Sequence, residues 1–218
     1  MGFKVGTSVI SVGNEASAAL SGDRVVITRD SILQWKLEGR VFYAQQGDVG
    51  TKLDWAETAY DEDQPQFALR IPQGTLVIPL AMNLTLEDTS GATEGFIIWS
   101  TTTNDIGDSA TSVSAPIVNY RRDALYSSSC TARSLYTDNA TAATGLIEVK
   151  RWYIPFASAL VTDGKDLWNS YDWTYEDPSM PILVGPATLQ VHIYATGDGY
   201  HGYGQYTWVE LNATDMGL

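Results

Sequence analysis

The chain has 218 residues, of which 44% are hydrophobic and 11% aromatic, and this is enough apolar material for a sizeable core. Its formal net charge is −13, from 13 basic and 26 acidic side chains, and such a surface repels nucleic-acid phosphates and anionic membranes. The single cysteine, Cys130, excludes an intrachain disulfide. We therefore predict a folded protein that binds neither nucleic acid nor membrane.

The chain divides into an arm and one domain. Residues 1–23 are rich in Gly, Ala and Ser with scattered apolar positions, which predicts an extended N-terminal arm. Residues 24–218 carry turn signals at the short, regular spacing of β proteins and show no repeat of fixed period. They are predicted to form a single β-sandwich domain.

The first strands are predicted between residues 24 and 46. Trp35 and Leu37 alternate with charged residues, which is typical of a strand with one buried face. A glycine then interrupts the pattern, and residues 40–46 predict the next strand. An acidic loop follows at residues 47–64.

A long strand is predicted at residues 75–86, directly after the turn Pro72-Gln73-Gly74. Its alternate apolar residues, Leu76 to Leu86, fall on one face. Pro79 interrupts this strand, and because proline lacks an amide hydrogen for the sheet ladder, it indicates an edge position or a bulge. Further strands are predicted at residues 52–55, 67–71, 95–102, 113–120 (interrupted by Pro116), 145–156 and 166–176.

Residues 187–211 predict a closing β-hairpin. Leu189, Val191 and Ile193 fall on one face of its first strand, and the residues between them fall on the other. Four glycines within residues 197–204 are interpreted as the turn, since strand patterns flank them on both sides. The predicted fold class is all-β: an antiparallel β-sandwich, jelly-roll-like, with about nine to eleven strands and little helix.

Residues typical of catalysis are scarce. His192 and His201 stand apart and lie in no metal-binding spacing, so each is interpreted as an ordinary surface or half-buried histidine. No nucleophile elbow or phosphate-binding loop is present in the sequence. Cys130 is interpreted as a small buried or half-buried residue, because no basic residue lies beside it to lower its pKa. We predict no catalytic residue, no cofactor and no enzymatic activity.

Two acidic segments, residues 61–63 and 163–166, offer oxygen ligands at short spacing. Calcium takes six to eight oxygens, so a site requires several loops to converge. Solvated acidic loops are the expected state, with a bound calcium ion as the open alternative.

Aromatic residues gather shortly before the C-terminal strands: Trp168, Tyr171, Trp173 and Tyr175. They are candidates for a platform that stacks on a sugar or for a subunit interface. The alternative is that they fill the core. Strand geometry places Trp173 and Tyr175 on the same face.

The Ser/Thr-rich, glycine-punctuated strands resemble those of virion structural proteins with a jelly-roll or β-sandwich fold. Residues 71–80, 83–87 and 206–211 carry this resemblance, above all to the decoration (cement) proteins of tailed-phage capsids. The resemblance implies a non-enzymatic protein on the capsid exterior. It further implies binding to the lattice of the major capsid protein and a homo-oligomer, most often a trimer.

Three other functions stay open from the sequence. A single-jelly-roll capsid protein usually has a basic arm facing the genome, whereas residues 1–23 contain only Lys4 as a basic side chain. A carbohydrate- or receptor-binding module would use the aromatic residues 168–175. A β-sandwich enzyme is the weakest alternative, since nothing selects an acid–base pair.

Overall fold

The computed structural model describes most of the chain from residue 31 onward. The described residues are 19–20, 26–27, 31–48, 50–55, 59–87, 95–109, 111–123, 126–154, 168–177, 179, 181–195 and 200–217. Of the predicted N-terminal arm, only Ala19–Leu20 is described, as a strand (β1) paired with β2, Val26–Ile27. The rest of the arm lies outside the described residues.

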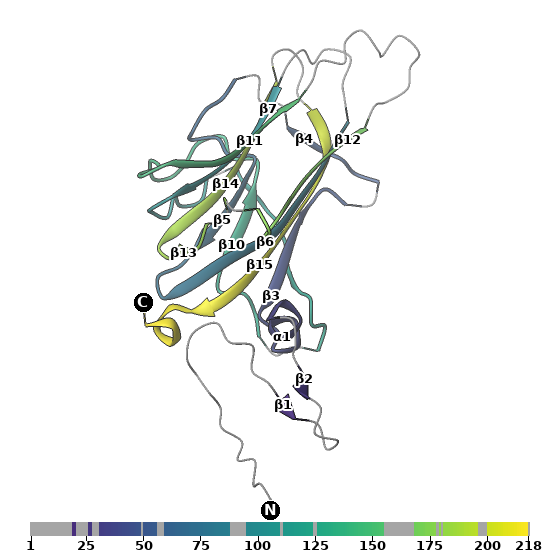
Figure 1. Ribbon diagram of the computed structural model, residues 1–218. Coiled ribbons are helices and arrows are strands. Elements are labelled where there is room, and N and C mark those ends of the chain that lie inside the picture. Colours follow the sequence, from purple (N-terminus) through teal and green to yellow (C-terminus); the bar gives the residue numbers. More distant parts are fainter. Residues whose placement is uncertain are drawn as a thin grey trace, which may run out of the picture.

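Two antiparallel sheets packed face to face form the body of the protein (Figure 1). One has six strands in the order β11-β7-β14-β5-β10-β8, and the other has seven, with β12-β6-β15-β3-β9 in order, β13 beside β6 and β4 beside β15. The six-stranded sheet contains β11 (Ile147–Ile154), β7 (Gly95–Thr102), β14 (Ala187–Ala195), β5 (Phe67–Ile71), β10 (Thr131–Ser134) and β8 (Val113–Ser114). The seven-stranded sheet contains β12 (Trp168–Thr174), β6 (Thr75–Glu87), β15 (Tyr200–Asn212), β3 (Val41–Gln46), β9 (Ile117–Asn119), β13 (Leu183–Val184) and β4 (Leu53–Trp55).

The strand pairing is nested. Strand β3 pairs with β15, β5 with β14, β6 with β12 and β7 with β11. The first long strand thus pairs with the last, and both strands of each following pair lie, in the sequence, between the two strands of the pair before it. This is the connectivity of a jelly roll. The predicted all-β sandwich is confirmed. Short strands such as β8 and β13 bring the number in the two sheets slightly above the prediction.

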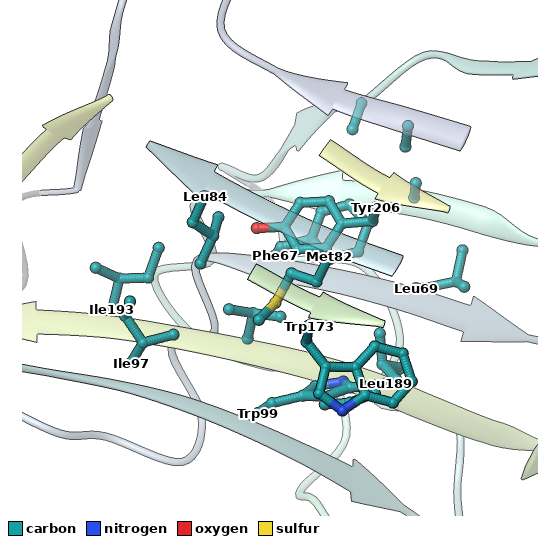
Figure 2. Close-up of a cluster of buried hydrophobic side chains, with 14 of the residues drawn as sticks. Phe67, Leu69, Met82, Leu84, Ile97, Trp99, Trp173, Leu189, Ile193 and Tyr206 are labelled. Carbon is teal, nitrogen blue, oxygen red and sulfur yellow. The ribbon is translucent and has the colours of Figure 1, made fainter. Parts of the chain in front are cut away.

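The core lies between the sheets, where aromatic rings reach across from opposite sides (Figure 2). Phe67 of β5 stacks on Tyr206 of β15 with ring centroids 3.7 Å apart. Trp99 of β7 meets Trp173 of β12 edge-on at 4.2 Å. Each pair joins one sheet to the other, and such pairs add about 0.5–1.5 kcal/mol to the effect of burial.

The predicted C-terminal hairpin is wrong. Strand β14 pairs with β5 and β7 in the six-stranded sheet, whereas β15 pairs with β3, β4 and β6 in the other sheet. Leu189, Val191 and Ile193 do share the core face, as predicted. Two strands that face one another across a core show the same alternation as two strands of a hairpin. The pattern therefore does not distinguish these arrangements.

Two of the glycines assigned to the hairpin turn, Gly202 and Gly204, lie inside β15 instead. A Cβ atom on Gly202 would lie 2.1 Å from the backbone oxygen of Thr85 on β6. The residue is therefore glycine because the two backbones approach closely. The other two, Gly197 and Gly199, lie outside the described residues.

The strand predicted around Trp35 is also wrong, because Ser31–Leu37 forms a helix, α1. Ile32 and Trp35, three residues apart, pack on a second apolar cluster that contains Val41 and Leu80. Their spacing fits a helical period, and this tertiary contact overrides the weak alternation read from the sequence. At seven residues, α1 is short, and none of the described helices is long and apolar enough to span a membrane.

The bulge predicted at Pro79 is confirmed. The register between β6 and β15 shifts at this point, where Thr207 lies opposite Ala81 and Trp208 opposite Pro79. The shift reverses the faces of β6, so the expectation that all alternate residues from Leu76 to Leu86 share one face is wrong. Met82, Leu84 and Leu86 face the main core, whereas Ile78 and Leu80 join the cluster beneath α1.

Pro116 separates two short strands that enter different sheets. Strand β8 before it pairs with β10, and β9 after it pairs with β3. The predicted interruption is confirmed, and the chain crosses between sheets at this residue.

Candidate interaction surface

The four aromatic residues singled out in the sequence do not form one exposed platform among the described side chains. Trp173 is only 3% exposed and packs on Trp99 in the core. Tyr171 is partly buried against the same core. These two residues therefore stabilise the sandwich.

The remaining two lie at either end of β12. Tyr175 follows the strand and is exposed, while its backbone amide donates to the oxygen of Leu80 at 2.8 Å. Trp168 pairs with Glu87 through its backbone, but its side chain lies outside the described residues. Trp173 and Tyr175 thus differ in exposure although the sequence placed them on one face.

An apolar groove lies at one edge of the sandwich, between β11 of the six-stranded sheet and β13 of the seven-stranded sheet. It encloses about 530 Å³, and its lining includes Ile147, Ile182 and Val184. Ile147 and Ile182 are 62% and 59% exposed. Large branched side chains this exposed and this close together are typical of surfaces that contact another protein.

The strand beside the groove has a free edge. In the described part of the sheet β11 pairs only with β7, so its other backbone edge has no strand beside it. A bulge interrupts its register between Glu148 and Lys150. Free edges offer unpaired amides and carbonyls to a neighbouring chain.

An ion pair lies close to the groove, next in sequence to its lining residue Val149 and two residues before Ser179. Lys150 of β11 donates to Asp177, just after β12, at 2.8 Å. Hydrogen bonds from Lys150 and from Ser179 lower the pKa of Asp177 to about 2. Asp177 is therefore charged at neutral pH, and the groove beside it is lined by apolar residues together with polar ones such as Thr101 and Glu148.

The sequence does not predict this groove, because the apolar run between Pro181 and Pro186 is too short to show a period. The available signal is the apolar run that contains Ile182 and Val184 between two prolines.

The histidines are placed differently from one another. His201 lies on β15 with Nε2 at 3.3 Å from Asp54 of β4. His192 on β14 is buried, which corrects the prediction of a surface or half-buried residue. Burial lowers the pKa of His192 to about 4, so its ring is neutral at pH 7. The ring of Tyr60 covers it edge-on, with centroids 5.1 Å apart.

Cys130 is buried, as the sequence predicted. Burial raises the pKa of its thiol far above the usual value, and the nearby carboxylate of Glu210 acts in the same direction. A thiol that stays protonated is a poor nucleophile.

The structure brings together no convincing metal site within the residues it describes. No group of three or more His, Cys, Asp or Glu side chains is arranged there to hold an ion. In the first acidic segment, the amide of Asp63 donates to the side chain of Asp61 at 2.9 Å. The second segment, residues 163–166, lies outside the described residues.

Comparison of the sequence with models of known protein families finds no match, and neither does a search of curated proteins. Function is therefore inferred from the jelly roll and its surfaces.

Proposed function

We propose that this protein is a non-enzymatic structural subunit of a virion that works as a capsid decoration (cement) protein. The nested strand pairing supports this proposal most strongly, because the jelly roll is a common building unit of viral shells. Aromatic pairs join the two sheets across the core, which makes the sandwich rigid. A rigid module suits a protein whose role is to bind other subunits.

The charge of the chain favours a place on the outside of the shell. At a net charge of −13, the surface repels a packaged genome. A subunit on the capsid exterior has no such constraint. The proposed partner is the lattice of the major capsid protein, with the chain itself arranged as a homotrimer.

The groove between β11 and β13 is the proposed contact surface. Its exposed isoleucines are buried when a neighbouring subunit covers them, and apolar side chains at the centre of an interface carry much of its binding energy. The free edge of β11 extends the same surface.

Binding to empty tailed-phage capsids tests this role. In co-sedimentation, we expect the wild type to bind and the double variant Ile147→Ser, Ile182→Ser to bind at least about tenfold more weakly. Val113→Ser is the matched control, since Val113 is an exposed apolar residue on β8, at the opposite edge of the same sheet. Equal loss of binding in the control, or no binding by the wild type, would contradict the proposal.

The nested pairing itself favours a second candidate, a single-jelly-roll subunit of the shell. Such a subunit assembles without a pre-existing lattice. Light scattering and electron microscopy of the concentrated chain alone distinguish the two roles. Closed shells would indicate the shell subunit, whereas a small oligomer that binds only preformed capsids would indicate the decoration protein.

A further inference from the structure

The outer face of the six-stranded sheet buries polar side chains that lack partners. Ser100 of β7 and Gln190 of β14 lie directly opposite one another and are 1% and 0% exposed. Within the described residues, the hydroxyl of Ser100 and both polar atoms of the Gln190 amide make no hydrogen bond. The Nε2 atom of His192, two residues further along this face of β14, likewise has no partner there.

Unpaired polar groups are costly in a protein interior. Each buried donor or acceptor left without a partner costs about 1–3 kcal/mol, so such groups normally contact ordered water or a ligand. Ser100 and Gln190 lie opposite one another on neighbouring strands. Together they carry a hydroxyl, an amide donor and an amide acceptor close to one another.

A pocket lies over Ser100. It encloses about 400 Å³, with Ile98 and Ser100 among its lining residues and with Tyr60, Tyr194, Glu148 and Arg151 around them. A single water occupies only about 30 Å³ of liquid, whereas pockets of about 300–1,000 Å³ hold small-molecule ligands. The pocket therefore has room for more than the water that would satisfy Ser100.

The surrounding side chains are aromatic on one side and polar on the other. The rings of Tyr60 and Tyr194 lie 5.9 Å apart. From β11, Arg151 donates to both carboxylate oxygens of Glu148, with Nε to Oε1 at 3.0 Å. This paired fork holds both groups in place and leaves further donors and acceptors free.

These features select the chemistry of the ligand. The Glu148 and Arg151 charges cancel, and the net charge of −13 disfavours an anion. A ring with an apolar face and several hydroxyl groups satisfies both sides of the pocket, because its face packs on tyrosine while its hydroxyls pair with the Ser100 hydroxyl and the charged groups. We propose that this pocket binds a neutral saccharide. This site adjoins the groove, since Glu148 lines both, but the proposal does not depend on the virion role.

Saturation-transfer NMR on the full chain tests the site, with the methyl glycosides of glucose, galactose and N-acetylglucosamine as probes at millimolar concentration. We expect transfer to the ring protons of at least one glycoside. Tyr60→Ala and Ser100→Ala should each weaken binding about tenfold, through loss of a stacking ring and of a buried hydroxyl.

Tyr175→Ala is the matched control, because Tyr175 is 41% exposed and Tyr60 is 40% exposed, and Tyr175 directly follows β12 of the other sheet. It should leave binding unchanged. Circular dichroism verifies that each variant is folded. If Ser100→Ala unfolds, the binding measured for Tyr60→Ala decides the test, because Tyr60 is exposed. Absence of transfer to all three glycosides, or equal binding by wild type and Tyr60→Ala, would overturn the proposal and leave the pocket to ordered water.

Discussion

Gln46 and Gln190 are both buried glutamines, one in each sheet, and their amides have opposite surroundings. The Nε2 atom of Gln46 donates to the backbone oxygen of Gln66 at 2.6 Å and to Ser134 at 2.9 Å. Its Oε1 atom accepts from the hydroxyl of Tyr206 at 2.7 Å. By contrast, neither polar atom of Gln190 has a partner in the described part of the chain.

The difference shows which polar groups serve the fold. Gln46, on β3, links the seven-stranded sheet to β10 of the six-stranded sheet, so its hydrogen bonds hold the sandwich together. Gln190 faces away from that core, on the sheet face that also carries the proposed saccharide pocket. Because the amide of Gln190 makes no hydrogen bond within the described residues, it does not link the two sheets as the amide of Gln46 does.

The largest effect is expected in the core that both sheets share. Trp173→Ala removes the indole that packs on Trp99, and a buried tryptophan truncated to alanine costs about 3–5 kcal/mol. Chemical denaturation measures this loss. Tyr175→Ala, two residues away and exposed, should change stability by less than about 0.5 kcal/mol. A folded, stable Trp173→Ala protein with weakened assembly would instead place Trp173 at an interface.

A smaller effect concerns pH and the outer face of the six-stranded sheet. Burial lowers the pKa of His192 from its usual value of 6.5 to about 4, so between these pH values the unfolded chain binds a proton that the folded protein does not. Stability is therefore complete above pH 6.5 and falls as the pH drops toward 4, by about 3 kcal/mol in total.

Urea unfolding at pH 7 and pH 4.5 measures this dependence, with His192→Phe as the comparison. The variant keeps a ring of similar size and cannot bind the proton. An equally steep loss of stability in wild type and variant would show that His192 is not the group responsible.

The smallest effects compare the two glutamines directly. Gln46→Leu leaves the hydroxyl of Tyr206 buried without its acceptor and should cost about 2 kcal/mol. Gln190→Leu removes an unpaired amide and should be neutral or slightly stabilising. Thermal unfolding of the two variants side by side measures both effects. Equal destabilisation would mean that Gln190 is paired in the protein as Gln46 is.

The sequence predicted the strands better than their arrangement. Alternation located β3, β4, β5, β6, β7, β11 and β14 near their observed positions, because each strand has one face in a common core. It did not reveal that β14 and β15 lie in different sheets, since facing strands and paired strands share the same period. It also missed α1, whose seven residues give too few turns for a helical pattern to stand out.

The candidate surfaces were harder to predict. Alternation places Gln190 and His192 correctly away from the core face, but it does not show that residues from the loop before β5, such as Tyr60, cover that side of the sheet. Ile182 and Val184 meet Ile147 only through the jelly roll, which brings segments distant in sequence to one edge. Such sites depend on long-range pairing that no local pattern contains.

The mass of the purified chain in solution, by native mass spectrometry with and without empty tailed-phage capsids, tests the proposed structural role most directly. We predict a trimer that shifts onto the capsids when they are added. A monomer that ignores the capsids and forms no shells at high concentration would contradict a role in the virion.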